Sequence, residues 1–270
     1  MRDITFVTET YSKRKPKDYE LSISIRRDGF SFLITHKQDV MAYSYVIAVG
    51  EGREAAFKDF LAQDILQPEF KSVSIIIVTP RFTLVPKKFY DDTLLDKYVA
   101  MNFEKSENES IITYESVNTE AVVLFPIETT FWAMCRLTFK KNESVSYVPQ
   151  VAPILEANCK SRKEKLCVSV ENSFFTALFI KGKELRFCNA FEFHNVNDFL
   201  FYVMNIFEQL HLNPLEVEVE LSGKINEKSA YYTAIQLFVK KVEIANPPKE
   251  GCKGLPYTLF YNHCNVALCE

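Results

Sequence analysis

The fold is decided by the stretch KLCVSVENSFFTALFIKGKELRFCNAFEFHNVNDFLFYVMNIFEQL, residues 165–210, together with its continuation to residue 246. Runs of apolar and β-branched residues separated by turn residues predict three strands, at residues 165–171, 174–181 and 184–193. The continuation predicts, in order, a helix at 195–210, a strand at 216–221, a helix at 227–241 and a short strand at 242–246. The order βββαβαβ indicates a mixed sheet with helices packed on it.

The helix at 195–210 has the clearest pattern. Its apolar residues recur at the i, i+3, i+4 and i+7 spacing of one helix face: Val196, Phe199, Leu200, Val203, Ile206, Phe207 and Leu210. Asn195 is a good N-cap, and Asp198 is placed to return a hydrogen bond at the positive end of the helix. In the strand that follows, Val217, Val219 and Leu221 face one way and three glutamates face the other, so one face of that strand is polar.

The first half of the chain repeats this order. Three strands are predicted at 19–27, 30–36 and 40–49, followed by a helix at 53–66 and a nearly continuous apolar strand at 73–78. The two halves share almost no residues, so what is repeated is the architecture.

Two features set the predicted domain limits: the longer segment between the two repeats, and the charged run at residues 160–165. Residues 1–162 are predicted to form a first lobe with an insertion, and residues 163–247 a second lobe. The intervening segment predicts a helix at 91–103, strands at 110–115 and 120–125, a helix at 127–139, a strand at 144–148 and a helix at 152–159. The tail, residues 248–270, is apolar enough to pack back on a lobe, either as a last strand or as a helix.

Composition argues against several classes of protein. The net charge of −3 and the pI near 5.9 provide no basic surface for nucleic acid, and the only densely basic run, KRKPK at 13–17, reads as a solvated linker. No signal-peptide pattern and no window of about 18 apolar residues is present, so we expect no integral membrane segment. The seven cysteines have no disulfide-scaffold spacing, which indicates reduced thiols in a cytoplasmic protein.

Two copies of a βββαβ core, each extended by helices, resemble the plan of the actin-like superfamily (actin, heat-shock chaperones and sugar kinases), which is built on the ribonuclease H-like fold. The stretch LRFCNAFEFHNVNDFLFYVMNIFEQLHLNPLEVEVELSGKI, residues 185–225, and the ending ALCE resemble a Bacteroidota family of proteins of unknown function with an actin-like fold. VPKKFYDD at 85–92, then a strand pair and LFPIETTF at 124–131, is also similar to actin-like proteins of pilus and secretion assembly. The resemblance covers most of the chain and implies an α/β fold of two actin-like lobes with mixed sheets.

The resemblance also implies where a nucleotide would bind: at two acidic hairpin turns that hold phosphates and Mg²⁺, and at a glycine-rich turn under the adenosine. The first hairpin, SISIRRDGFSF, contains Asp28–Gly29 as a two-residue turn but has arginines at the strand end, so a plain β-turn is the simpler interpretation. The second, CVSVENSFFTAL, has no glycine. Residues 171–173 form its turn, and Phe174 and Phe175 are expected where small residues would admit phosphate.

The third turn, LSGKI, follows a strand and is expected to open a helix. It places Ser222, Gly223 and Lys224 at the adenosine turn, with one glycine instead of two. The simpler interpretation is that Gly223 serves only to supply positive φ between strand and helix. Phosphoryl transfer needs carboxylates and close phosphate contacts together, and neither hairpin offers both. The pattern therefore predicts a degenerate site; we expect no cofactor, with ATP and Mg²⁺ as the alternative.

No catalytic or metal-binding residue is predicted. The four histidines lie in no motif, and Cys252, His263, Cys264 and Cys269 could form a zinc set but include no C-x-x-C pair. A ribonuclease H-like nuclease would need a carboxylate cluster at strand ends, which is not seen. Two hypotheses remain: a non-catalytic scaffold that binds a protein partner or itself, which we favour, and an ATP-binding protein or weak ATPase that uses the cleft between the lobes.

Overall fold

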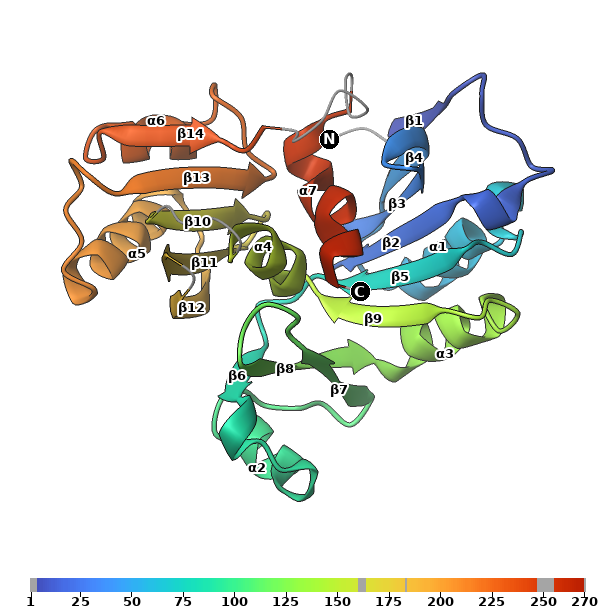
Figure 1. Ribbon diagram of the computed structural model, residues 1–270, viewed down its shortest axis with the longest axis horizontal. Helices are drawn as coiled ribbons and strands as arrows, with labels where there is room; N and C mark the ends of the chain where they lie inside the picture. Colours follow the sequence, from blue (N-terminus) through green and yellow to red (C-terminus); the bar gives the residue numbers. More distant parts are fainter. Residues whose placement is uncertain (1–3, 160–163, 183, 247–254, 270) are drawn as a thin grey trace. The chain divides into compact units, whose positions relative to one another are not determined.

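The computed structural model describes residues 4–159, 164–182, 184–246 and 255–269. The chain divides into two compact units (Figure 1). The first consists of Met1–Ser116 and Glu120–Ala152 with the last two residues, and the second of Val117–Thr119 and Pro153–Leu268. The charged run that was expected to mark a boundary falls at 160–165, of which residues 160–163 lie outside the described residues.

The first unit is built on a six-stranded sheet of order β1-β4-β3-β2-β5-β9. The strands are β1 (Ile4–Val7), β2 (Glu20–Arg26), β3 (Gly29–His36), β4 (Asp39–Ile47), β5 (Ser72–Ile77) and β9 (Val145–Pro149). Pairing among the first four is antiparallel, whereas β5 is parallel to β2 and β9 is parallel to β5. The three predicted meander strands and the apolar strand are confirmed, with ends within two residues of prediction.

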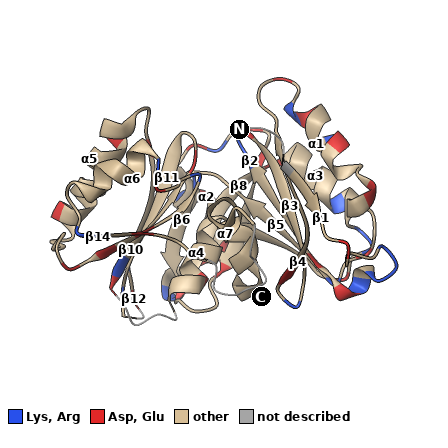
Figure 2. Cartoon of the chain, turned by 90° about the horizontal axis from the view of Figure 1, so that it is seen from above, with Lys and Arg blue, Asp and Glu red and all other residues tan. Residues whose placement is uncertain are grey.

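Helices α1 (Arg53–Leu61) and α3 (Thr129–Thr138) pack on the side of this sheet that carries Phe30. The centroid of the Phe30 ring lies 4.6 Å from that of Phe57 on α1 and 6.0 Å from that of Phe131 on α3. All three side chains are buried. In Figure 2 the charged residues mark α1 and the loops, while most of the sheet is uncharged, as a covered sheet requires.

The insertion after β5 forms a three-stranded antiparallel sheet of order β6-β8-β7, with a short helix on it. The elements are β6 (Thr83–Pro86), β7 (Glu109–Glu115), β8 (Ala121–Glu128) and α2 (Leu95–Ala100). Val99 of α2 is buried against Val85, Val122 and Leu124 of the strands. The insertion therefore has a small apolar core of its own.

Three expectations for the insertion need correction. β6 is absent from the prediction, because four residues ending in proline are too short to show a strand period. β8 continues through Pro126, so the helix predicted at 127–139 begins only at Thr129. The helix predicted at 91–103 is reduced to α2, preceded by a 3₁₀ turn.

The second unit has a five-stranded sheet of order β12-β11-β10-β13-β14. Its strands are β10 (Lys165–Val170), β11 (Phe174–Lys181), β12 (Glu184–Glu192), β13 (Glu218–Gly223) and β14 (Lys241–Ile244). The first three pair antiparallel, β13 is parallel to β10, and β14 is parallel to β13. This is the order β4-β3-β2-β5-β9 of the first unit. The predicted repeat of architecture, and with it the α/β fold of mixed sheets, is confirmed.

Helix α5 (Val196–Gln209) lies where the sequence predicts it. Asn195 is its N-cap, with Oδ1 accepting hydrogen bonds from the backbone N–H groups of Asn197 (2.9 Å) and Asp198 (3.1 Å). The Asp198 carboxylate reaches back to the N–H of His194 (3.0 Å), one residue before the cap. The apolar face of α5 is buried in the core of the unit together with Phe175.

Helix α6 (Ala230–Gln236) is shorter than the prediction at 227–241. Ser229 caps it by accepting a hydrogen bond from the N–H of Tyr232 (3.2 Å), so the helix begins three residues late. The polar loop before Ser229 separates the helix from β13.

The remaining helices are α4 (Val151–Asn158) and α7 (Tyr257–Asn265). α7 settles the form of the tail as a helix: it packs on β13, and Thr258 Oγ1 donates a hydrogen bond to the Ile225 carbonyl (3.2 Å). Residues 247–254, including Cys252, lie outside the described residues.

Three expectations from composition concern the cysteines, metal binding and membrane-spanning helices. Six cysteines of the described residues carry free thiols. Within the same part of the chain, no group of three or more His, Cys, Asp or Glu side chains is arranged to hold a metal ion. No helix in the described ranges is both long enough and apolar enough to cross a membrane.

Candidate functional site

The carboxyl ends of two neighbouring strands bring together two segments that the sequence singles out. β10 ends at Val170 and β13 at Gly223, and these two residues are partners in the parallel ladder. Glu171, of the second hairpin turn, therefore lies beside Lys224, of the predicted adenosine turn. In open α/β sheets, ligands bind beyond the carboxyl ends of the strands, so this edge is the candidate site of the second unit.

Gly223 has a structural reason to be glycine. Its φ is +86°, in the left-handed region, and a Cβ on it would collide with the carbonyl oxygen of Val170. The same oxygen accepts a 2.7 Å hydrogen bond from the backbone N–H of Lys224. Ser222 is buried within β13, and the turn does not open a helix directly, because α6 begins only at Ala230. A role for this turn in binding adenosine stays a prediction.

Glu171 and Lys224 form a buried ion pair. Lys224 Nζ lies 3.7 Å from Glu171 Oε2, and the two side chains are only 8% and 6% exposed. A single buried charge would be costly, so each of these residues needs an opposite charge close by. The carboxylate at this strand end is therefore already engaged by a cation of the chain itself.

Phe174 and Phe175 do not both border this edge. Phe175 lies in the core, where its ring stacks on that of Phe191 (5.2 Å between centroids) and meets that of Phe199 edge-on (5.0 Å). Successive side chains of a strand point to opposite faces, and Phe174 is buried on the other one. Phe175 is therefore a core residue, and the expectation that Phe174 and Phe175 stand where small residues would admit phosphate stays a prediction.

The first hairpin turn lies one residue earlier than predicted. Its two residues are Arg27 and Asp28, and Gly29 already belongs to β3. Gly29 has a φ of +155°, and a Cβ on it would collide with the Val46 carbonyl oxygen of β4. The glycine is thus required by the close approach of a strand. Arg26, the last residue of β2, is almost completely buried.

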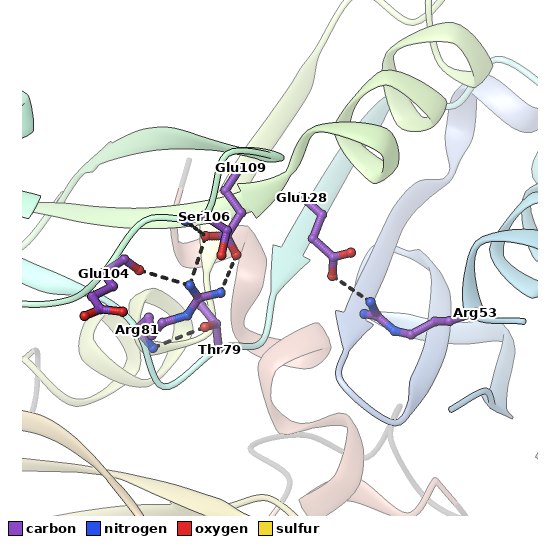
Figure 3. A network of polar contacts seen from close by, with 7 residues as sticks. All are labelled: Arg53, Thr79, Arg81, Glu104, Ser106, Glu109 and Glu128. Carbon is purple, nitrogen blue, oxygen red and sulfur yellow. Dashed lines mark hydrogen bonds and ion pairs between the residues drawn. The ribbon is translucent and has the colours of Figure 1, made fainter. Parts of the chain in front are cut away.

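Two arginine–glutamate pairs lie near the strand ends of the first unit (Figure 3). In the first, Arg53 at the start of α1 donates hydrogen bonds to Glu128 Oε1 (2.7 Å) and to the Arg26 carbonyl (2.6 Å). Its guanidinium also lies 4.5 Å from the centroid of the Phe131 ring. A carboxylate, a carbonyl and an aromatic ring together hold the Arg53 side chain in one position.

The second pair joins Arg81 to Glu109. Both terminal nitrogens of Arg81 donate to the carboxylate, Nη1 at 2.9 Å from Oε2, and Nη1 also donates to the Glu104 carbonyl at 3.2 Å (Figure 3). The backbone N–H of Ser106 donates to the same carboxylate (3.0 Å). Burial by itself raises the pKa of Glu109, but the hydrogen bonds from Arg81 and Ser106 outweigh it and hold the pKa below its usual value.

Glu109→Gln is expected to flatten the dependence of stability on pH in acid. A carboxyl whose pKa is lower in the folded protein stabilises the fold above its unfolded-state pKa and loses that contribution as the pH falls through its folded-state pKa. The wild type should therefore lose free energy of unfolding faster than the variant from about pH 4.5 downward. Urea unfolding of both proteins at about pH 6 and about pH 4 measures this. A difference that is the same at the two pH values would contradict it.

A small cavity lies at these two pairs. Its volume is about 90 Å³, and it is lined in part by Arg27, Arg53, Thr79, Arg81, Glu109 and Glu128. Sites for drug-sized ligands measure roughly 300 Å³ or more, so this cavity alone has no room for a nucleotide. Both glutamates that line it form an ion pair with an arginine of the same unit.

Sequence reasoning found the strand-end segments of the second unit and missed the arginine–glutamate pairs of the first. One signal was available: Arg53 begins a helix, where the positive end of the helix dipole disfavours a cation, so an arginine there needs an anionic partner. That partner, Glu128, lies 75 residues away in the chain. No local pattern could identify it.

The chain is similar to known proteins in sequence and in fold. The sequence matches the DUF3822 family, described as a protein of unknown function, over residues 8–242. No curated protein matches the sequence. The structure is similar to a Bacteroides thetaiotaomicron protein with an actin-like ATPase fold and unknown function, with a TM-score of 0.82 and 22% identity over 96% of this chain and 99% of that one.

Two further structures share the fold at lower similarity. PilM of the PilM–PilN type IV pilus biogenesis complex has a TM-score of 0.57 at 10% identity, over 94% of this chain and 100% of that one. The ethanolamine utilization protein EutJ from Carboxydothermus hydrogenoformans has a TM-score of 0.54 at 7% identity, over 98% and 94%. Since the family match spans most of the sequence and the repeated sheets have these counterparts, the chain belongs to the DUF3822 family of proteins of unknown function and has the actin-like ATPase fold.

Proposed function

We propose that this chain is a non-catalytic actin-like protein that works by binding a protein partner or itself, and that its nucleotide site is degenerate. One observation carries the proposal: three glutamates near the carboxyl ends of the central strands are each paired with a cation of the chain. The pairs are Glu171–Lys224, Glu128–Arg53 and Glu109–Arg81.

This pairing opposes phosphoryl transfer for an electrostatic reason. The reaction needs carboxylates that hold Mg²⁺ and a backbone that approaches the phosphates closely. Glu171 could take a metal ion only by giving up its ion pair with Lys224, and separating two buried opposite charges is costly. The close approach that Gly223 allows is already used by the Val170 carbonyl. The groups at this strand end are therefore already bound to other groups of the chain, which supports a structural role for the site.

Exposed apolar side chains support the interaction part of the proposal. Phe201 of α5 is 65% exposed, and Leu237 and Phe238, which follow α6, are 77% and 52% exposed. Large apolar groups at the surface are typical of protein–protein contacts when they gather in one patch, and Phe201 and Phe238 line one shallow pocket. PilM, which shares the fold, provides an example in which an actin-like protein is found in a complex with another protein.

The rival function is that of an ATP-binding protein or weak ATPase. The turn after β13 favours this function, because Gly223 has a positive φ and is followed directly by Lys224. A turn of that shape at a strand end suits a nucleotide in related folds. It requires that the Glu171–Lys224 pair open on binding.

Isothermal titration of the intact chain with Mg-ATP separates the two functions. We expect no binding tighter than about 100 μM, which corresponds to roughly −5.5 kcal/mol. Titrations with MgCl₂ alone and with ATP in excess EDTA show whether any heat comes from the metal or from the nucleotide. A dissociation constant well below that limit, dependent on Mg²⁺, would favour the rival function and contradict ours.

A further inference from the structure

A pocket on the first unit combines apolar walls with positive charge. Its volume is about 450 Å³, and it lies between helix α3 and the strands β7 and β9. The residues that matter for its chemistry are Ile112, Trp132, Arg136, Lys140, Val145 and Tyr147. Its volume is within the range of pockets that bury a ligand or several peptide side chains, unlike that of the cavity at the arginine–glutamate pairs.

One wall holds an unused hydrogen-bonding group. The hydroxyl of Tyr147 is buried and makes no hydrogen bond with any described residue. Burial raises the pKa of Tyr147, and nearby Cys135 acts in the same direction, so the phenol stays protonated and can donate. A buried hydroxyl without a partner is uncommon because it is costly, and such a group in a pocket wall points to a bound acceptor.

The rim of the pocket is cationic. Arg136 and Lys140 are both exposed, and the guanidinium of Arg136 lies 5.1 Å from the centroid of the Trp132 ring. Neither cation takes part in an ion pair with the described residues, and none of the described residues that line the pocket is acidic. The two charges therefore complement an acidic partner.

Two sheets end at this pocket. β9 is the last strand of the six-stranded sheet, and β7 is the last strand of the three-stranded sheet. Val145 and Tyr147 come from β9 and Ile112 comes from β7. The outer side of a terminal strand has backbone groups that can pair with an extended peptide, while alternate side chains of that peptide enter pockets.

We propose that this pocket binds an extended acidic peptide segment of a partner protein. An apolar side chain of the segment would pack against Trp132 and Tyr147, and its carboxylates would lie at Arg136 and Lys140. The inference rests on the proposed interaction function and names the chemistry of the partner.

The chain itself provides a local reporter. Trp132 is the only tryptophan of the 270 residues, so intrinsic tryptophan fluorescence reports on this pocket alone. The probe is a library of random ten-residue peptides displayed on phage and selected on the intact chain. Selected peptides are then synthesised and titrated while Trp132 emission is followed. We expect peptides that shift this emission to be acidic and to contain an apolar residue.

Charge-reversal variants then test the rim. Arg136→Glu with Lys140→Glu should weaken binding of those peptides by at least about tenfold, equivalent to ~1.4 kcal/mol. Lys141→Glu is the matched control, because this exposed lysine is next to Lys140 but does not line the pocket. It should change binding by less than about threefold. Circular dichroism confirms that each variant is folded.

The possible outcomes distinguish a failure of this proposed binding site from a failure of the proposed function. Peptides that bind without changing Trp132 emission, and bind the double variant as well as the wild type, would overturn this site but leave an interaction function in place. Neutral or basic peptides that shift the emission, or a library that yields no binder, would also overturn it. Tight Mg-ATP binding in the titration described above would contradict the proposed function itself, whatever the peptides do.

Discussion

Gly223→Ala is expected to lower the free energy of unfolding by about 3 kcal/mol. A left-handed φ costs a non-glycine residue about 1–2 kcal/mol, and the new methyl group would collide with the Val170 carbonyl. Relief of that collision would stretch the 2.7 Å hydrogen bond from Lys224 N to Val170 O, which adds about 1–2 kcal/mol for buried groups left poorly paired. Urea unfolding at neutral pH measures the change.

Gly182→Ala is the matched control. Gly182 also belongs to the second unit and has a φ of +64°, but a Cβ on it would meet nothing within 4 Å. It should therefore cost only about 1 kcal/mol, and the difference between the two variants measures the contact with Val170. Equal costs would show that β10 does not press on Gly223. A Gly223→Ala protein that is stable but has lost ATP binding by about tenfold would show that the turn holds a nucleotide.

Most of the fold could be predicted because its elements have local signals. Helix α5 combines a long apolar face with the Asn195 cap, and each sheet has its strands in runs bounded by turn residues. The repeated strand order then required only that the two halves be set side by side. Errors occurred where a local signal is short or misleading. β6 has four residues, β8 contains Pro126, and the polar loop before Ser229 reads as the first turn of α6.

The candidate site could be predicted only in part, because its residues meet through tertiary structure. The segments at Glu171 and Gly223 were recognised from their places after strands. Their contact depends on the parallel pairing of β10 with β13, which no spacing in the sequence shows. The same holds for Arg81 and Glu109, which come from segments on either side of α2. The reason for a glycine at position 223 becomes clear only once it is known that β10 packs against it.

Lys224→Met is expected to lower the free energy of unfolding by about 3–5 kcal/mol, because it breaks a buried ion pair. Methionine can fill the space of the lysine stem, so the loss is mainly electrostatic. Glu171 would remain a buried carboxylate after losing the Lys224 ammonium group, which lies 3.7 Å from it in the wild type. Urea unfolding at neutral pH measures this cost.

The double variant Lys224→Met/Glu171→Leu tests whether this cost comes from breaking the ion pair. Replacing a buried ion pair by apolar residues of similar volume is often nearly neutral, so the double variant should recover most of the stability lost in Lys224→Met. Lys181→Met is the control, because its ion pair with Glu164 is 57% and 46% exposed and should contribute less than about 1 kcal/mol. If Lys224→Met costs no more than this control, the strand end is open to water and internal pairing does not close the nucleotide site.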